Sequence, residues 1–193
     1  MRADWSVYEG KRAIRRVLDR IPGLERLEPN AVTVSVLVPA VLAGVGLAER
    51  WWIVAALGIA GTMLLATLDG HIAERFGKST RLGGYLNRLI TEIADAVTLI
   101  GLLAIADAAV VAVLIALTWI VNVAGVLGPA AGGSIQWVGP AAQADRRALL
   151  LAAALVSTVW PLDWTVLCVI LIGLLAITAA LRARRSIQEL RGS

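Results

Sequence analysis

Six long apolar runs dominate this sequence and limit what the chain can fold into. They cover residues 31–48, 52–69, 83–105, 108–127, 147–160 and 164–182. A helix needs about 20 residues to cross about 30 Å of bilayer hydrocarbon, and the fifth run is the shortest by that measure. Of the 193 residues, 59% are hydrophobic, against roughly 45–50% in a soluble domain. We therefore predict an all-α integral membrane protein with six transmembrane helices.

The segment before the first run has the pattern of an amphipathic helix. Ile14, Val17, Leu18 and Ile21 follow helical spacing and share one face, while arginines and a lysine occupy the positions around them. Such a helix is typical of an interfacial element lying on the membrane surface, although an ordinary solvated helix has the same pattern. We divide the chain into an amphipathic juxtamembrane helix at 1–27, a six-span domain at 28–183 and a basic tail at 184–193.

Lys and Arg alternate between the connections and predict the orientation of the chain. Basic residues are concentrated before the first run, between the second and third, between the fourth and fifth, and after the sixth, whereas the other three connections hold only Arg50. Basic connections stay in the cytoplasm. We therefore expect a multi-pass protein of the cell membrane with both termini cytoplasmic. The net charge of +4 flanks apolar runs, which favours membrane lipid as a partner and excludes nucleic acid.

Polar residues inside the apolar runs are costly, so each is a functional candidate. Asn87, Thr91 and Asp95 recur at every fourth position and line one face of a helix. Asp69 and Gly70 end the preceding run, so Asp69 is expected to face Asn87 and Thr91 across a short basic link. Oxygen ligands without His or Cys suit Mg²⁺ or Mn²⁺.

The same residues also have a purely structural interpretation. Asp69 could form an ion pair with Arg75 or Arg88, and the amide and hydroxyl groups could bond across helices as they do in many membrane bundles. The spacing alone leaves both interpretations open.

Three stretches resemble the CDP-alcohol phosphatidyltransferase family. Its signature has Asp, two residues, Asp-Gly, two residues, Ala-Arg, eight residues, Gly, three residues, Asp, three residues and Asp; the matching positions here are Asp69, Gly70, Ala73 and Gly83. Pro29-Asn30-Ala31-Val32-Thr33 resembles the start of the family's first span. Gly139-Pro140 followed by Asp145-Arg146 resembles an element that some members carry before their fifth span.

The departures from the signature fall on the acidic positions. The first Asp of the family falls at Ala66, the third at Asn87 and the fourth at Thr91, while the Arg after Ala falls at Glu74. The Lys of the Gly-Pro element falls at Gln143. Of the four acids, Asp69 alone remains in register.

The resemblance implies a reaction and a set of site residues. Family members bind a CDP-linked donor and two divalent ions, transfer the phosphoalcohol to an acceptor hydroxyl and release CMP. With fewer acids we expect one Mg²⁺ or Mn²⁺ rather than two, with ligands drawn from Asp69, Asn87, Thr91 and Asp95. Substrate or nucleotide contacts are expected from Asn30, Thr33, Gly70, Ala73, Arg75, Gly83 and Arg146. Thr91 cannot act as the base near neutral pH, so the candidate catalytic residues are Asp69, Asp95, Glu92 and His71.

Two other functions remain open at this stage. The missing acids are compatible with a catalytically inactive pseudoenzyme that binds a lipid or a partner protein. They are also compatible with an enzyme that uses another diphosphate, such as an isoprenoid diphosphate. Since family members commonly dimerise, the resemblance also implies a homodimer as a candidate assembly.

Overall fold

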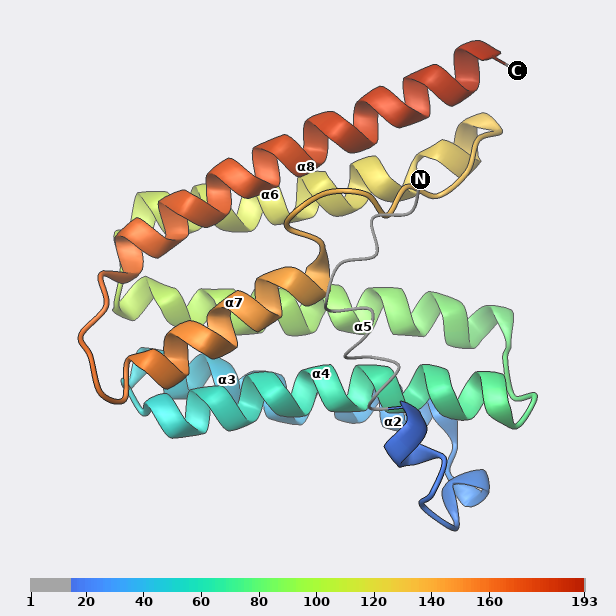
Figure 1. The fold of residues 1–193 in the computed structure, drawn as a ribbon, viewed down its shortest axis with the longest axis horizontal. Helices are drawn as coiled ribbons and strands as arrows, with labels where there is room; N and C mark the ends of the chain where they lie inside the picture. Colours follow the sequence, from blue (N-terminus) through green and yellow to red (C-terminus); the bar gives the residue numbers. More distant parts are fainter. Residues whose placement is uncertain (1–14, 193) are drawn as a thin grey trace.

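The protein is a bundle of helices in the computed structural model, which describes residues 15–192 (Figure 1). No strand occurs in this range. The helices are α2 (Pro29–Ser35), α3 (Leu37–Ala48), α4 (Trp52–Arg75), α5 (Arg81–Ile100), α6 (Ala108–Val126), α7 (Gln143–Val156) and α8 (Trp164–Gly192). Short 3₁₀ turns at Leu24–Arg26, Gly101–Ala104 and Gly128–Ala131 complete the described elements.

Four helical stretches are long and apolar enough to cross a membrane. They are Pro29–Ala48, which combines α2 and α3, together with α4, α6 and α8. Helix α5 carries Arg81, Arg88, Glu92 and Asp95, and α7 has only 14 residues. The integral membrane class is therefore supported by four helices, and the predicted count of six depends on whether α5 and α7 also cross.

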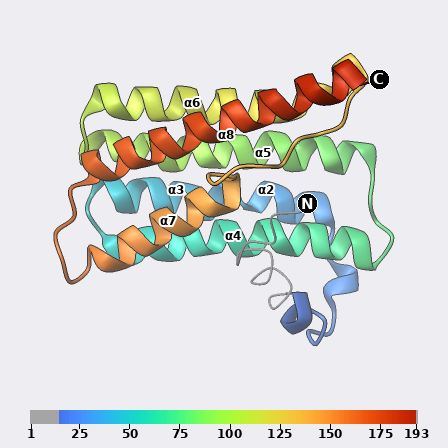
Figure 2. The same cartoon turned by 45° about the horizontal axis from the view of Figure 1, so that its top comes forward.

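The connections gather at opposite ends of the bundle (Figure 1). The links that follow α3, α5 and α7 lie at one end. The link between α4 and α5, the turn after α6 and the C-terminus lie at the other. Helix α7 is inclined against α4 and begins part of the way along the bundle (Figure 2). The chain thus runs up and down six times, with α7 covering less of the length than its neighbours.

The helix bounds differ from the predicted runs mainly at their polar ends. Helix α4 continues to Arg75 and α8 to Gly192, so the predicted basic tail is largely helical. Helix α7 begins at Gln143, where the Asp145 carboxylate accepts a hydrogen bond from the Ala142 N–H at 3.1 Å, and it ends before Ser157. Residues 15–18 are helical, whereas residues 19–20 and 22–23 form turns and Leu24–Arg26 a 3₁₀ turn, so the predicted helix at 1–27 does not continue past residue 18. Residues 1–14 of that prediction lie outside the described residues.

Glycines bring the first helices into close contact. A Cβ atom built on Gly58 of α4 would lie 2.6 Å from the carbonyl oxygen of Pro39, and one on Gly44 of α3 would lie 2.6 Å from that of Val97 in α5. Only glycine permits such approaches of backbone to backbone, which is how many membrane helices associate. This packing fixes α3 against α4 and α5, and thereby the ends of the helices that carry the polar residues.

Candidate functional site

The Asp69 carboxylate is the centre of a small buried cluster. Its Oδ2 atom accepts a hydrogen bond of 2.7 Å from the Thr33 hydroxyl of α2 and another of 2.7 Å from the Asn87 side-chain amide of α5. Asp69 and Thr33 are each 2% exposed. The predicted meeting of Asp69 and Asn87 is therefore present, and neither Arg75 nor Arg88 is the partner of this carboxylate.

The local sequence explains how three helices meet at Asp69. The Thr80 hydroxyl caps α5 by accepting a hydrogen bond from the Gly83 N–H at 2.9 Å. A Cβ atom on Gly83 would lie 3.0 Å from Asn30 Oδ1, so this glycine allows the start of α2 to approach the start of α5. A Cβ atom on Gly70 would meet nothing within 4 Å, and open space therefore borders α4 immediately after Asp69.

Two predicted site residues point away from this cluster. The Thr91 hydroxyl donates to the backbone carbonyls of Asn87 and Arg88, at 2.6 and 3.0 Å. His71 leaves α4 about 200° around the helix from Asp69, and its Nε2 atom lies 3.4 Å from Asp19 Oδ1 without forming a hydrogen bond. The structure does not bring Thr91 or His71 into contact with the Asp69 carboxylate.

The segment before α2 is held against the end of α4 by charged groups. Arg75 pairs with Asp19 at 2.7 Å, and Glu74 pairs with Arg15 at 2.7 Å. The Lys78 ammonium donates to the carbonyls of residues 25 and 27. Arg75, which the sequence offered as a substrate or nucleotide contact, thus holds the N-terminal segment in place together with Lys78.

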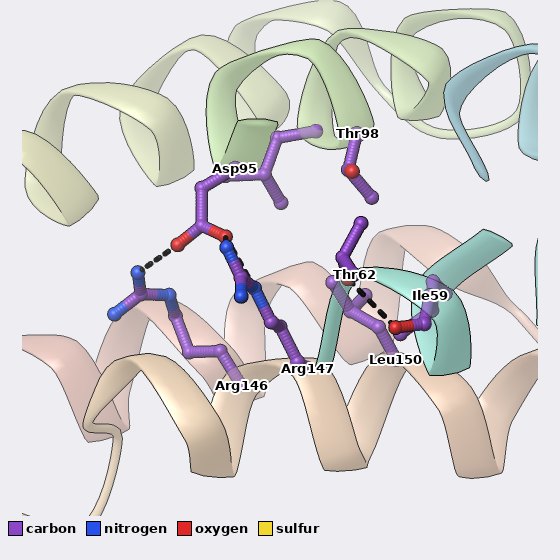
Figure 3. Close-up of a pocket in the computed structure, with 8 residues that line it drawn as sticks. Ile59, Thr62, Asp95, Thr98, Arg146, Arg147 and Leu150 are labelled. Carbon is purple, nitrogen blue, oxygen red and sulfur yellow. Dashed lines mark hydrogen bonds and ion pairs between the residues drawn. The ribbon is translucent and has the colours of Figure 1, made fainter. Parts of the chain in front are cut away.

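Asp95 belongs to a second cluster, which lies two turns further along α5 than Asn87 and includes residues from the start of α7 (Figure 3). Its carboxylate contacts Arg146 Nη2 at 2.7 Å and Arg147 Nη2 at 2.6 Å. Gln143 Nε2 also donates to it, at 3.1 Å. The expectation that Asp95 joins Asp69 around one metal ion is not matched by these contacts, because two buried guanidinium groups compete for both of its oxygens.

Further buried charges surround the second cluster. The Glu92 carboxylate accepts a hydrogen bond from the Asn122 amide of α6. Arg182 of α8 is 3% exposed and donates to the backbone carbonyls of Val138 and Val121, at 3.0 and 2.9 Å. Charged groups at this depth are costly and are usually paired or functional.

The residues present fit one divalent ion and do not fit two. Within residues 15–192, no group of three or more His, Cys, Asp or Glu side chains is placed to hold a metal. Two ions close together need several anionic oxygens, whereas Asp69 supplies one carboxylate and its contacts are a hydroxyl and an amide. A single ion with an anionic substrate as co-ligand is within reach of this set.

Sequence reasoning missed the partners of Asp95. Arg146 and Arg147 counted as basic residues of a cytoplasmic connection, but they are 2% and 7% exposed and lie in the first turns of α7. The sequence did contain a signal for this pairing. A buried acid such as Asp95 needs a cationic partner, and two adjacent arginines, Arg146 and Arg147, stand at the start of the fifth apolar run.

Comparison with known proteins shows the family to which this chain belongs. The family model for CDP-alcohol phosphatidyltransferase matches residues 26–142. The chain belongs to this family of membrane transferases of phospholipid biosynthesis, whose members typically bind divalent metal ions.

Two relatives cover most of the chain. It is 27% identical over 164 residues to archaetidylinositol phosphate synthase of Methanothermobacter thermautotrophicus, a match that spans 83% of this chain and 84% of the relative. Its fold is similar to that of Mycobacterium tuberculosis phosphatidylinositol phosphate synthase, solved with CDP-DAG bound, with a TM-score of 0.68 and 21% identity over 93% of this chain and 92% of that one.

Proposed function

We propose that this protein transfers a phosphoalcohol group from a CDP-linked donor to an acceptor hydroxyl and releases CMP. The observation that carries the proposal is the buried contact of Asp69 with Thr33 and Asn87. Asp69 and Asn87 stand at signature positions of the family on α4 and α5, and Thr33 belongs to the stretch that resembles the start of the family's first span. The proposal includes six membrane crossings with both termini and this cluster on the cytoplasmic side. The gathering of alternate connections at opposite ends of the bundle supports that topology.

The donor is proposed to bind beside Asp69, at the ends of α2, α4 and α5. A structural relative was solved with CDP-DAG bound, so a CDP-linked lipid is the donor class to test first. The open space next to Gly70 offers a place for the diphosphate, and the residues proposed to line it are Asn30, Thr33, Gly70, Ala73 and Gly83.

One Mg²⁺ or Mn²⁺ ion is proposed to be held by Asp69 and the Asn87 side chain, together with the donor diphosphate. When bound, such an ion neutralises charge on the leaving CMP. The protein's own contribution is to orient the Asp69 carboxylate through the two neutral hydrogen-bond donors on Oδ2. We leave Thr91 and Asp95 out of this proposed ligand set because their contacts lie elsewhere.

The acceptor is proposed to carry a phosphate group of its own. Arg146 and its neighbours Arg147 and Arg182 form a buried basic cluster, and guanidinium groups bind phosphate well. Both relatives are synthases of inositol phosphate lipids, which supports an anionic acceptor of that kind.

A catalytically inactive pseudoenzyme is the second candidate. This alternative is favoured by the contacts of the three candidate carboxylates, because Asp69, Glu92 and Asp95 each accept a hydrogen bond from another side chain of the protein. None of these three is placed as an unoccupied base. Such a protein would bind the CDP-linked lipid without releasing CMP.

Thermal unfolding of the detergent-purified protein tests the donor site. CDP or CMP with Mg²⁺ or Mn²⁺ should raise the melting temperature, because a ligand that binds only the folded state stabilises it by about 2.7 kcal/mol at a hundred times its Kd. Asp69→Asn should abolish the metal-dependent part of the shift. The matched control is Glu49→Gln, an acid at the opposite end of the bundle, which should keep the full shift.

Release of CMP from CDP-diacylglycerol then separates the two candidates. A nucleotide shift with CMP release supports the transferase. A nucleotide shift without release, across a panel of phosphorylated and neutral alcohols, supports the inactive binder. Absence of any metal-dependent shift in the native protein would exclude a donor site at Asp69.

A further inference from the structure

The carboxylate of Asp95 fills the space between two arginines (Figure 3). Oδ2 accepts from Arg146 Nη2 at 2.7 Å, while Oδ1 accepts from Arg147 Nε at 2.7 Å. The three side chains are between 3% and 9% exposed. Both oxygens of one anion thus bridge two guanidinium groups, an arrangement that a phosphate group also forms with arginine.

Two further charged groups lie near this fork. Arg182 lies close enough to Arg146 and Glu92 to interact with both electrostatically. Arg182 is held by the backbone carbonyls of Val121 and Val138. Three buried guanidinium groups thus lie in this part of the bundle, and guanidinium groups bind phosphate well.

The fork has no room for a further anion while Asp95 occupies it. The adjoining cavity has a volume of about 10 Å³ and is lined by Thr62, Thr98 and Leu150 as well as the charged residues. That volume holds about one water molecule. A phosphate group can therefore reach both arginines only if the Asp95 side chain gives up its position.

We propose that Asp95 is an internal substitute for a phosphate ligand. Its carboxylate holds Arg146 and Arg147 in a preformed fork, and a phosphate group binds there in exchange for Asp95. The inference rests on the proposed function in one respect, namely that Arg146 binds phosphate. It adds that this chain carries its own competitor for that site.

The competition has a quantitative consequence. A site that is open in only a fraction of the molecules binds its ligand more weakly by that same fraction. Removing the negative charge of Asp95 should therefore strengthen phosphate binding. In the alternative, Asp95 orients Arg146 and Arg147 while phosphate binds to other atoms of the two arginines. Removing the charge of Asp95 should then weaken phosphate binding.

Titration with inorganic phosphate at constant ionic strength tests the proposal. The readout is the melting temperature in detergent, so a less stable variant remains measurable. Asp95→Asn should respond to phosphate with a half-saturating concentration at least about tenfold below that of the native protein. The double variant Asp95→Asn with Arg147→Met keeps the net charge of the buried group but lacks the fork, and its response should be lost.

A lipid headgroup is a second source of the same chemistry. Parallel titrations use phosphatidic acid in mixed micelles, with phosphatidylcholine as the neutral comparison. A response to either source that strengthens in Asp95→Asn supports the proposal and identifies the source. Equal or weaker responses to both sources in Asp95→Asn overturn it.

Two further variants make the result specific. Thr98→Val alters the same cavity, but its hydroxyl bonds only to the Ala94 carbonyl of its own helix, and phosphate binding should stay unchanged. If Asp95→Asn does not fold, Gln143→Met removes one hydrogen bond to the carboxylate at constant charge. It should tighten phosphate binding by about 2- to 10-fold, and an unchanged affinity would overturn the proposal.

The outcome is independent of the donor experiment. The nucleotide response depends on Asp69 and should persist in Asp95→Asn. A native protein that ignores CDP but shows the phosphate pattern would contradict the transferase and leave the internal substitute standing.

Discussion

Asp69 is stabilised by neutral donors, which is unusual for a carboxylate that is almost fully buried. The Thr33 hydroxyl and the Asn87 amide supply its contacts on Oδ2, and the nearby cations are engaged with the N-terminal segment. Its negative charge is therefore not cancelled by an arginine, in contrast to Asp95. An uncancelled carboxylate beside open space is what binding of a cation requires.

Thr33→Val tests how much the hydrogen bond from Thr33 to Asp69 contributes to stability and to metal-dependent binding. The variant keeps the volume of the side chain but removes the donor, leaving a buried carboxylate oxygen with one partner fewer. We expect a loss of about 1–3 kcal/mol in the free energy of unfolding and a weaker metal-dependent nucleotide shift. Chemical denaturation in detergent and the thermal assay measure the two effects.

The control for Thr33→Val is Thr67→Val. Thr67 lies on α4 two residues before Asp69, and its hydroxyl bonds only to the Met63 carbonyl of the same helix. The nucleotide shift should be unaffected in this control. Equal losses in the two variants would mean that the Thr33 contact has no special role at Asp69.

At the same scale, the sequence predicted the contact of Asp69 with Asn87 but not the partners of Asp95. Spacing places Asn87, Thr91 and Asp95 on one face of α5, and the first of them meets α4 as expected. A face that spans nine residues passes more than one neighbouring helix, however, and two turns further along α5 this face meets α7. Periodicity defines a face of a helix, and tertiary packing decides which neighbour each part of it contacts.

Helix packing in the first half of the bundle depends on individual glycines. Gly58 approaches Pro39 and Ala43 of α3 so closely that a Cβ atom would lie 2.6 Å from the Pro39 carbonyl oxygen and 2.8 Å from the Ala43 Cα atom. Backbone atoms cannot move aside as a flexible side chain can. The separation of α3 and α4 is therefore set by the absence of one methyl group.

Gly58→Ala should destabilise the protein by about 3 kcal/mol or more, because both helices must shift to admit the methyl group. Gly173→Ala is the matched control in α8, where a Cβ atom meets nothing within 4 Å, and it should be neutral or gain up to about 1 kcal/mol. Thermal unfolding of both variants measures the difference. A mild effect at Gly58 would mean that α3 and α4 can separate without cost.

At the element scale, the apolar runs predicted where the helices lie but not where they end. Helix α6 occupies nearly its whole predicted run, because apolar residues fill it and Asp107 caps its start. Helices α4 and α8 continue well past their runs, since polar residues extend a helix as readily as apolar ones. Hydropathy marks the membrane region, and helix length is set by caps and breaking residues.

For the whole molecule, two topologies differ in whether α5 and α7 cross the membrane in addition to the four apolar stretches. The four apolar helices alone would form a four-span protein, with α5 and α7 confined to one side each. Six crossings require the charges on α5 and α7 to be buried inside the bundle. The pairing of Asp95 with Arg146 and Arg147 meets that requirement, because paired and buried charges are tolerated at membrane depth.

Single cysteines at two positions separate the topologies. With six crossings, Ala108 at the start of α6 lies outside and Ala131 after α6 lies in the cytoplasm, whereas four crossings reverse both. We expect a membrane-impermeant maleimide to label Ala108→Cys in intact cells and to label Ala131→Cys only after lysis. Cys168 is fully buried and is replaced by Ala so that each variant holds one thiol.

Two positions that do not distinguish the topologies serve as controls. Ser79→Cys should be protected in intact cells and Thr158→Cys should be labelled, in either topology. Labelling of Ala131→Cys in intact cells, with Ala108→Cys protected, would place α5 and α7 outside the hydrocarbon. In that topology α5 would lie on the cytoplasmic side and α7 on the outer side, with the bilayer between them. Asp95 of α5 could then not contact Arg146 and Arg147 of α7. These ion pairs are therefore the reason to expect labelling of Ala108→Cys in intact cells and protection of Ala131→Cys.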